Sequence, residues 1–389
     1  MPGTIKDKVA IIGAGYTKFG ELWNKGLDDL MVEAAYEAYN DAGVEPKDIQ
    51  AIWVGVFYYF TGLSGCTAVE PLKLFGKPAS RVENFCASGM DAFRNACFAV
   101  ASGVYDIALA CGVEKLMDSG SRGLPGLKDY GHPVYGTPSA PAMFALAATR
   151  AFHKYEWTKE DLARVAVKNH FNGAKHPKAH FRKEVTMEEV MNAPMIAYPL
   201  GRYDCCAMSD GAAALIITRP EIAKEYNHSD DYVLVKGNGL AVETVMPYYK
   251  PSFDYLGFPA TQKAAQEAYK QAEVKDPRKE ISLAEVHDCF TITELLNYED
   301  LGFCKKGEGA ELIREGVTAI DGELPVNPSG GLKCFGHPIG ASGCRMLVEV
   351  TKQLQGRADG RQVKDPVLGL CHNLGGPASV SSVTILGRK

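Results

Sequence analysis

The stretch Val82-Glu83-Asn84-Phe85-Cys86-Ala87-Ser88-Gly89-Met90 joins a strand-like run to a helical pattern. Apolar residues recur between 92 and 101 with the spacing of one helix face. We therefore expect Cys86 just before a helix N-terminus, where free backbone N–H groups and the helix dipole stabilise a thiolate. Small neighbours leave its sulfur open to a substrate carbonyl. A cysteine can equally be a buried core residue, so this stretch alone leaves both interpretations open.

The composition of the whole chain narrows the classes of protein to consider. Its 389 residues, 46% of them hydrophobic and 23% charged, suffice for two or three globular domains. A net charge of −5 provides no basic field for nucleic acid. We see no signal peptide and no apolar run long enough to span a membrane. Eleven cysteines without a C-x-x-C pair indicate free thiols in a reducing, cytoplasmic setting.

The second half of the chain repeats the first. The segment Ala34-Ala35-Tyr36-Glu37-Ala38-Tyr39 returns as Ala264-Ala265-Gln266-Glu267-Ala268-Tyr269, 230 positions later. A loop and an expected strand follow each copy, at 49–56 and at 281–286. This repeat predicts two copies of one α/β unit, with strands covered by helices and a ligand site between the copies.

Three further stretches carry reactive groups at the ends of expected elements. His287-Asp288-Cys289-Phe290 follows a strand and precedes a helix expected at 291–301. Gly336-His337-Pro338-Ile339-Gly340-Ala341-Ser342-Gly343 is expected as a loop that opens a helix at 344–354. Cys371-His372-Asn373-Leu374-Gly375-Gly376-Pro377 is expected to join strands at 367–370 and 380–386. Their shared placement at element ends favours a site over core packing.

Two other patterns do not favour a site. Gly13-Ala14-Gly15-Tyr16 follows an expected strand at 9–12 and is interpreted as a turn, since the third glycine of a dinucleotide-binding loop is missing. His170, His176 and His180 lie among lysines and arginines without an adjacent carboxylate. We interpret them as a solvated basic surface, and the sequence therefore predicts no metal site.

An inserted segment is expected at 115–204, because composition changes there and only short helical patterns, such as 141–155 and 159–169, occur. The aromatic block Phe57-Tyr58-Tyr59-Phe60 follows the strand expected at 49–56, in the position that His287-Asp288-Cys289-Phe290 takes in the second half. Equivalent positions of a duplicated fold approach the same centre. We expect the block near the site or at a subunit interface, with the other side closed by Tyr135, Pro138, Met143 and Phe144.

The segment at 84–90 and the loop at 336–343 resemble the thiolase superfamily closely, over nearly the full chain. His287-Asp288-Cys289-Phe290 is similar to the variant found in sterol-carrier-protein thiolases and archaeal acetoacetyl-CoA thiolases. The resemblance implies a duplicated α/β/α/β/α thiolase fold: an N-terminal half at 1–114 and 205–230, a loop domain at 115–204 and a C-terminal half at 231–389. It also implies coenzyme A thioester substrates, no permanently bound cofactor, and a homodimer or homotetramer. A small zinc-ribbon and OB-fold companion protein is a further implied partner.

The same resemblance implies roles for the reactive residues. Cys86 is the nucleophile that becomes acylated, and His337 activates it as a base. Cys289 is the first choice for the acid/base thiol, with Cys371 as the second choice, because the usual C-x-G-G-G loop is matched only loosely. His287 with His337 forms one oxyanion hole, and backbone N–H groups of Cys86 and of the Gly375-Gly376 turn form the other.

Several functions stay open beside acetoacetyl-CoA thiolysis, which the branch favours. One is a thiolase for a larger or aromatic 3-oxoacyl-CoA. A thiolase-like aldolase needs no acyl-cysteine, and a β-ketoacyl synthase typically uses a Cys-His-His set. A non-catalytic scaffold in a CoA-enzyme complex is the alternative from a different class.

Overall fold

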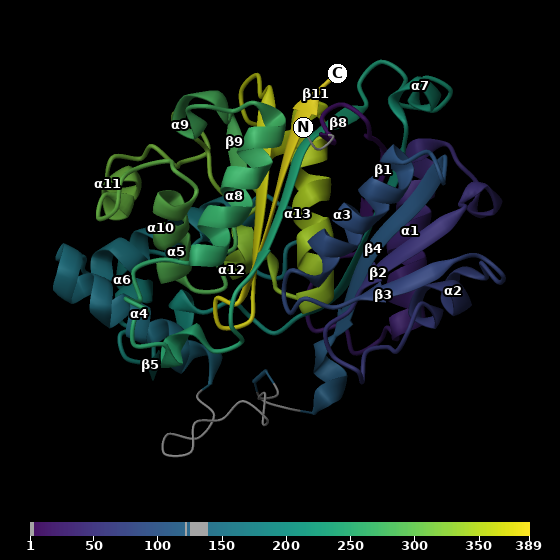
Figure 1. Ribbon diagram of the computed structural model, residues 1–389. Helices are drawn as coiled ribbons and strands as arrows, with labels where there is room; N and C mark the ends of the chain where they lie inside the picture. Colours follow the sequence, from purple (N-terminus) through teal and green to yellow (C-terminus); the bar gives the residue numbers. More distant parts are fainter. Residues whose placement is uncertain (1–3, 121–122, 125–138) are drawn as a thin grey trace.

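The computed structural model describes residues 4–120, 123–124 and 139–389 (Figure 1). Its main sheet has nine strands in the order β3-β2-β4-β7-β1-β8-β11-β10-β9. The N-terminal and C-terminal parts of this sheet pair through two residue pairs, Ala10 with Leu234 and Ile11 with Val233. The sheet therefore consists of two halves that are joined through β1 and β8.

The strands of the N-terminal half are β1 (Ala10–Tyr16), β2 (Ala51–Gly55), β3 (Ala79–Val82), β4 (Ile107–Lys115) and β7 (Asp210–Thr218). Those of the C-terminal half are β8 (Val233–Val242), β9 (Leu283–Glu285), β10 (Leu368–Gly375) and β11 (Val380–Arg388). A separate hairpin consists of β5 (Met195–Ala197) and β6 (Leu200–Gly201).

Helices form three layers around the two halves of the sheet (Figure 1). The N-terminal half is covered outside by α1 (Leu27–Ala42) and α2 (Cys66–Leu72), and the C-terminal half by α8 (Pro259–Ala272). Between the halves lie α3 (Ser88–Ala101) and α13 (Ile339–Leu354), which pack against each other. The predicted α/β/α/β/α thiolase layering is confirmed. Lys352 is the one residue of α13 that is not buried, as expected of a central helix.

The predicted duplication is visible in the strand order. In the N-terminal half β1, β7, β4 and β2 are neighbours in that order, and in the C-terminal half β8, β11, β10 and β9 follow the same pattern. The repeated segments at 34–39 and 264–269 lie in α1 and α8, each packed against the first strand of its half. Helix α3 of the N-terminal half and helix α13 of the C-terminal half are also equivalent: α3 packs against β4, and α13 packs against β10.

The segment 115–204 and the C-terminal half carry the remaining helices. They are α4 (Ala140–Tyr155), α5 (Lys159–Ala174), α6 (Met187–Met191), α7 (Pro220–Ala223), α9 (Pro277–Glu280), α10 (Thr291–Asp300), α11 (Gly309–Arg314) and α12 (Gly331–Phe335). The predicted helices at 141–155, 159–169 and 291–301 correspond to α4, α5 and α10. In the described part of the chain, no helix is long and apolar enough to cross a bilayer.

Three predicted boundaries are wrong. The turn expected at Gly13-Ala14-Gly15-Tyr16 is part of β1, since the two glycines let α1 pack directly on the strand: a Cβ on Gly13 would lie 2.3 Å from the Ala38 carbonyl oxygen. Helix α13 begins at Ile339, inside the stretch expected as a loop. Strand β10 runs from Leu368 to Gly375, so Cys371 lies within a strand.

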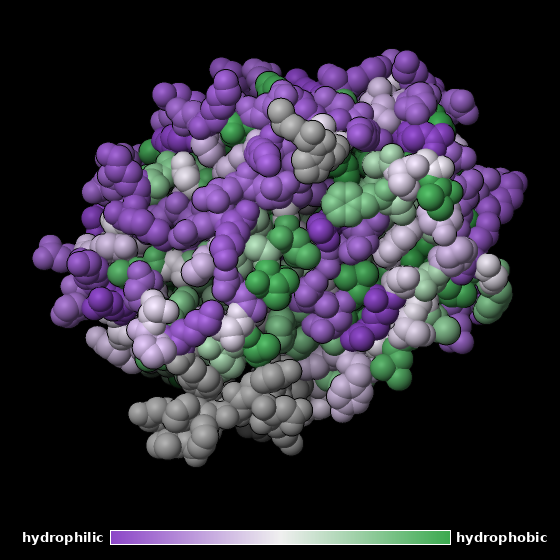
Figure 2. Space-filling model, in the orientation of Figure 1, coloured by the Kyte–Doolittle hydropathy of each residue, from purple (hydrophilic) through white to green (hydrophobic). Residues whose placement is uncertain are grey.

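Polar and charged side chains cover the upper and left parts of the face seen in Figure 2, and hydrophobic residues gather across its middle. Helix α3 lies in the middle of the same view in Figure 1. Its Phe98 is exposed, although most of this helix is buried.

Candidate active site

The loop that carries Cys86 lies between β3 and α3 and is fixed by its own hydrogen bonds. The Ser88 hydroxyl accepts the Asn84 backbone N–H at 2.9 Å and donates to the Phe85 carbonyl. Phe85 adopts a left-handed conformation, with φ of 51°. This tight turn leaves the Cys86 side chain half-buried, directly before the N-terminus of α3.

Glycines bring this loop against the N-terminus of α13. A Cβ on Gly89 would lie 2.3 Å from the Gly340 carbonyl oxygen, and one on Gly112 would lie 2.1 Å from the same atom. Any larger residue would separate the two helix ends. The close backbone contact explains why both the 84–90 and the 336–343 stretches need glycine, and it places His337 opposite Cys86.

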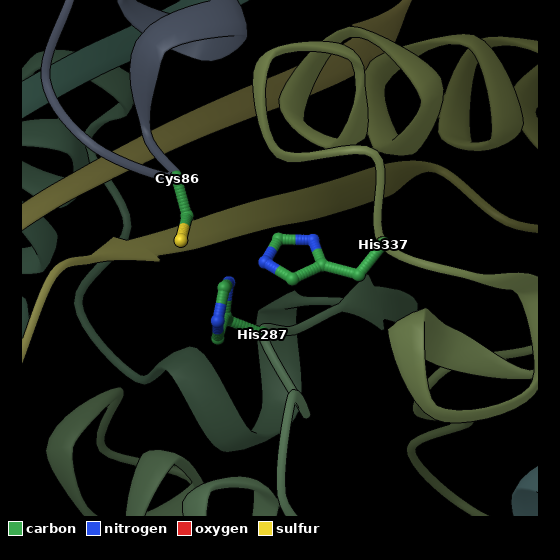
Figure 3. A group of neighbouring side chains, drawn as sticks. All are labelled: Cys86, His287 and His337. Carbon is green, nitrogen blue, oxygen red and sulfur yellow. The ribbon is translucent and has the colours of Figure 1, made fainter. Parts of the chain in front are cut away.

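Three predicted residues meet at this point (Figure 3). The Cys86 sulfur and one ring nitrogen each of His287 and His337 lie within 4.8 Å of one another. The imidazole rings are perpendicular, at 87°, with centroids 5.2 Å apart. Cys86 comes from the N-terminal half and both histidines come from the C-terminal half, so the site lies between the two copies, as predicted. This set could hold a metal ion, but it also has the composition of an activated cysteine nucleophile.

His337 is arranged as a neutral base. Its Nδ1 lies 2.7 Å from the Ser342 hydroxyl, whose own proton is donated to the Pro338 carbonyl at 2.9 Å. The hydroxyl therefore accepts from Nδ1–H, and Nε2 keeps a free lone pair. Among the described residues, this buried Nε2 has no hydrogen-bond partner. Burial, with a smaller effect of the Arg345 guanidinium, lowers the pKa of His337 to about 3, so the ring is neutral near pH 7.

His287 is arranged as a donor. The Asn373 amide nitrogen lies 2.9 Å from its Nδ1 and donates to it, which leaves the ring proton on Nε2. Burial, and then the neighbouring His337 and His372, lower the pKa of His287 well below its usual value. The backbone is also held, because the Asn297 amide donates to the His287 carbonyl at 2.7 Å.

The expectation that the free Cys86 is a stabilised thiolate is wrong. Backbone N–H groups of Gly376 and of Cys86 itself do bond to the sulfur and lower its pKa. Burial outweighs them, helped by the nearby Glu114 carboxyl, and raises the pKa of Cys86 to about 12. The resting group is therefore a thiol, and the unpartnered Nε2 of His337 lies within 4.8 Å of its sulfur. The Cys86 and Gly376 amides lie where an oxyanion hole was predicted.

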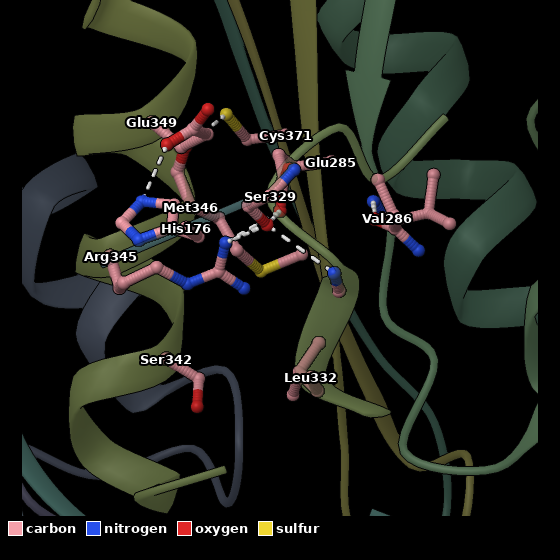
Figure 4. A network of polar contacts seen from close by, with 12 residues as sticks. His176, Glu285, Val286, Ser329, Leu332, Ser342, Arg345, Met346, Glu349 and Cys371 are labelled. Carbon is pink, nitrogen blue, oxygen red and sulfur yellow. Dashed lines mark hydrogen bonds and ion pairs between the residues drawn. The ribbon is translucent and has the colours of Figure 1, made fainter. Parts of the chain in front are cut away.

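The two candidate acid/base thiols lie in different surroundings. Cys289, directly before α10, is buried, and charges on Cys206 and Cys86 add to burial in raising its pKa. Cys371 instead donates to the Met346 carbonyl at 3.5 Å. It faces a buried polar network that includes the ion pair of Arg345 with Glu285 (Figure 4). Cys86 therefore influences the pKa of Cys289, whereas the groups that influence the pKa of Cys371 are Glu285, Arg345 and Glu349.

The predicted aromatic block packs beside the nucleophile. The Phe57 ring lies 5.5 Å from the Phe85 ring, and Tyr58 stacks on Phe60 at 4.7 Å. Phe144 stacks on Phe290 at 4.9 Å, within the core of the C-terminal half, and Met143 packs at the edge of that core. Tyr135 and Pro138 lie outside the described residues.

The predicted basic surface at His170, His176 and His180 is wrong. His170 and His176 are buried, and His180 is half-buried. His176 faces the Glu349 carboxylate at 3.5 Å in the network of Figure 4, and His180 contacts the Ser209 hydroxyl at 2.8 Å. Distant segments cover this part of the chain, which local charge composition does not reveal.

Three positioning residues were not singled out from the sequence. Asn373 and Ser342 lie inside quoted stretches, but an amide and a hydroxyl are weak signals beside cysteine and histidine. Glu114, at the end of β4, accepts backbone N–H groups of Phe57, Tyr58 and Gly340 at 3.1, 3.1 and 2.9 Å. Burial raises its pKa to about 7. Glu114 therefore ties the aromatic block to the start of α13.

A cavity of about 630 Å³ leads to His337. Its walls come mainly from the 115–204 segment and from the residues that follow it, and they also include Phe290 and His337. The volume suits an extended acyl-thioester arm. The cavity adjoins the Cys86 loop, because Met117 and Met208 line it and also pack in the cluster that contains Cys86.

Two family models together cover most of the chain. The model described as the N-terminal domain of thiolase matches residues 9–221, and the model of a thiolase C-terminal domain-like unit matches residues 248–388. The chain belongs to the thiolase family. The resemblance proposed from the sequence is therefore confirmed.

Individual relatives fall in the predicted branch of the thiolase family. The acetyl-CoA acetyltransferase of Methanothermobacter thermautotrophicus is 42% identical, covering 98% of this chain and 99% of that protein. Sterol carrier protein 2 of Bos taurus is 32% identical, covering 95% of this chain and 70% of that protein. A solved structure described as Ltp2-ChsH2(DUF35) aldolase has a TM-score of 0.87 and 26% identity, covering 99% of both chains. The protein is an acyltransferase of the thiolase type.

Proposed function

We propose that this thiolase cleaves and forms acetoacetyl-CoA through an acetyl group carried on Cys86. The observation that carries the proposal is the unpartnered Nε2 of His337, which faces the Cys86 sulfur from a ring held by Ser342. In the first half-reaction, His337 Nε2 takes the thiol proton while the sulfur attacks the thioester carbonyl. The amides of Cys86 and Gly376 bind the resulting oxyanion, and the proton then leaves with the departing thiol.

In the second half-reaction, Cys289 is the proposed acid/base. Its thiolate removes a proton from the α-carbon of acetyl-CoA, and the enolate oxygen accepts a hydrogen bond from His287 Nε2–H. In its resting tautomer His337 Nε2 carries no proton, so His287 is the donor proposed here. The carbanion attacks the acetyl-cysteine, and the thiolate released at Cys86 takes the proton that Cys289 removed, so both thiols return to their starting states. Gly375 extends the turn that holds the Gly376 amide.

The substrate is a coenzyme A thioester, and no residue described here is proposed to hold a permanent cofactor or metal. We propose that the 115–204 segment covers the thioester arm, since it supplies much of the cavity wall. Acetoacetyl-CoA is favoured because the relative at 42% identity is named an acetyl-CoA acetyltransferase. The aromatic block beside Cys86 keeps a larger or aromatic acyl group as the alternative.

A homodimer is the proposed assembly. Strand β3 ends the main sheet, so its outer edge is free to pair with a second copy, and the hydrophobic middle of the face in Figure 2 favours burial. A companion protein is a further proposal, supported by the structure described as Ltp2-ChsH2(DUF35) aldolase. Met195, Ile196 and Tyr198 form an exposed apolar surface beside the cavity that such a partner could cover.

The similarity to the solved structure described as Ltp2-ChsH2(DUF35) aldolase supports an aldolase as the second candidate function. A thiolase consumes CoA and releases acetyl-CoA, whereas an aldolase cleaves a β-hydroxyacyl-CoA without CoA. Steady-state assays with acetoacetyl-CoA plus CoA, and with a β-hydroxyacyl-CoA alone, separate the two. We expect CoA-dependent cleavage in the first assay. Carbonyl release in the second assay without activity in the first would contradict the proposal.

A further inference from the structure

A second cavity, of about 610 Å³, adjoins the catalytic cavity. The residues that line both cavities are His180, Phe181, Ile196, Cys205, Cys206 and Ala207. The second cavity has no carboxylate among its described lining residues. Every charged side chain in its wall is basic: Arg182, Lys183, Arg202 and Lys333. The cavity therefore has a positive potential.

Lys333 lies deepest among these basic residues. It belongs to α12 and is only 1% exposed, whereas Arg182 and Arg202 are exposed. Its ammonium group lies 3.3 Å from His170 Nε2 and 5.8 Å from the ring centres of Phe181 and Tyr203. His170 Nδ1 donates to the Lys183 carbonyl at 2.9 Å, so Nε2 accepts from Lys333. Burial, the largest cause, lowers the pKa of His170 to about 4, which makes this partner neutral.

Lys333 differs from the other buried lysines of the described chain. Lys115 pairs with Asp210 at 2.7 Å, and Lys168 pairs with Glu294 at 2.6 Å. Lys333 has no ion pair with any described residue. The nearby Asp288 carboxylate is used otherwise, because it accepts the backbone N–H groups of Leu332 and Lys333 at 2.6 and 3.2 Å. A buried ammonium without an anion is costly, and a ligand that supplies one would offset the cost.

We propose that the protein accepts, beside acetoacetyl-CoA, a longer 3-oxoacyl-CoA whose acyl chain ends in a carboxylate, and that Lys333 binds this carboxylate. Arg182 and Arg202 attract this group at the mouth of the cavity. The inference rests on the proposed thioester chemistry at Cys86 and names a substrate class for it.

The depth of Lys333 favours the acyl group over the phosphates of CoA as the source of the anion. Cys206 lines both cavities, and its backbone N–H donates to the Cys289 carbonyl at 2.9 Å. Cys206 therefore links the cavity that contains Lys333 to the segment that carries the proposed acid/base thiol. The phosphates of CoA are held away from the thioester by the long pantetheine arm, whereas a substituent of the acyl chain stays near the reacting carbon.

Matched substrate pairs test the proposal. Thiolysis is measured for 3-oxoadipyl-CoA against 3-oxohexanoyl-CoA, and for the corresponding pair with an eight-carbon acyl chain. The wild-type protein should prefer the carboxylate substrate of the better-fitting pair by at least about tenfold in kcat/KM, as a charged hydrogen bond provides. Lys333→Met should remove this preference and Lys333→Arg should keep part of it. The surface control Lys175→Met should keep all of it.

The ratio of the kcat/KM values of two substrates, measured in one preparation, does not depend on the fraction of folded protein. If Lys333→Met gives no folded protein, Arg202→Gln at the mouth should lower the same preference by a smaller factor. A wild-type ratio near one overturns the inference, while acetoacetyl-CoA thiolysis in the same preparation keeps the proposed function. In Lys333→Met, KM could instead rise equally for CoA and for both substrates of a pair, with the kcat/KM ratio of the pair unchanged. This result also overturns the inference and assigns Lys333 to a CoA phosphate.

Discussion

The two halves of this fold place different chemistry at equivalent positions. The loop before α3 carries Cys86, and the loop before its counterpart α13 carries His337. After β2 comes the aromatic block at 57–60, and after its counterpart β9 come His287 and Cys289. In the proposed mechanism, one half thus supplies the nucleophile and an apolar wall, and the other supplies the groups that move protons.

This difference shows what duplication contributes. Equivalent loops converge because the two helices touch through Gly89 and Gly340, whatever side chains the loops carry. The convergence belongs to the fold, and the division between nucleophile and acid/base groups belongs to a few side chains. Variants in either half should therefore remove separate steps of the reaction and leave the fold intact.

The largest effect is expected from the N-terminal half. Cys86→Ala should lower thiolysis at least about a thousandfold, because no other group can form the acyl intermediate, and the melting temperature should change little. Steady-state thiolysis and thermal unfolding measure the two quantities. Cys66→Ala, an exposed cysteine in α2, is the control. If Cys86→Ala keeps even a tenth of the wild-type rate, Cys86 is not the nucleophile.

The next effect is expected from the C-terminal half. Cys289→Ala should still accept an acetyl group on Cys86 but should exchange the α-protons of acetyl-CoA in deuterated buffer about a hundredfold more slowly. Cys371→Ala should exchange at nearly the wild-type rate, since its thiol bonds to Met346. The opposite pattern would transfer the acid/base role to Cys371.

A smaller effect is expected at Asn373, a positioning residue. Asn373→Ala frees His287 Nδ1, so the Nε2–H tautomer is no longer enforced. The kcat of α-proton exchange should fall about tenfold with little change in KM. Acetylation of Cys86 should proceed at the normal rate. An equal loss in both steps would show that the substitution disturbs the site as a whole.

A further effect, on stability and not on rate, is a pH dependence at Glu114, which joins the two halves. Burial raises its pKa from 4.5 to about 7, so the folded protein binds this proton more tightly than the unfolded chain. The stabilisation that the protonated Glu114 carboxyl gives the folded protein is complete below pH 4.5 and is lost as the pH rises to about 7. The unfolding free energy of the wild-type protein, relative to Glu114→Gln, should fall by about 3 kcal/mol across this window. Urea unfolding at several pH values measures it, and a constant difference would contradict the assignment.

Much of this arrangement could be predicted from the sequence. Cys86 and His337 lie at strand and helix ends marked by glycine and small residues, and such ends are local features. The repeat at 34–39 and 264–269 predicted that the site lies between two copies. These signals are short, and the fold brings them together through backbone contacts that glycine alone permits.

The features that sequence reasoning missed depend on distant packing. His176 is surrounded by basic residues along the chain, but it is buried against Glu349 of α13. The pKa of Cys86 follows from burial by other segments, which outweighs the nearby N–H groups. Gly13 lies in a strand because α1 packs on it, although the same letters also fit a turn.

The central claim is that acyl transfer passes through Cys86 with His337 as its base. The direct measurement is the mass of the intact protein and of its peptides after brief incubation with acetoacetyl-CoA. We predict one acetyl group on the peptide containing Cys86 in the wild-type protein, and none in a His337→Ala variant over the same time. An unmodified Cys86 in a protein that turns over acetoacetyl-CoA, or an acetyl group on a different cysteine, would contradict the account.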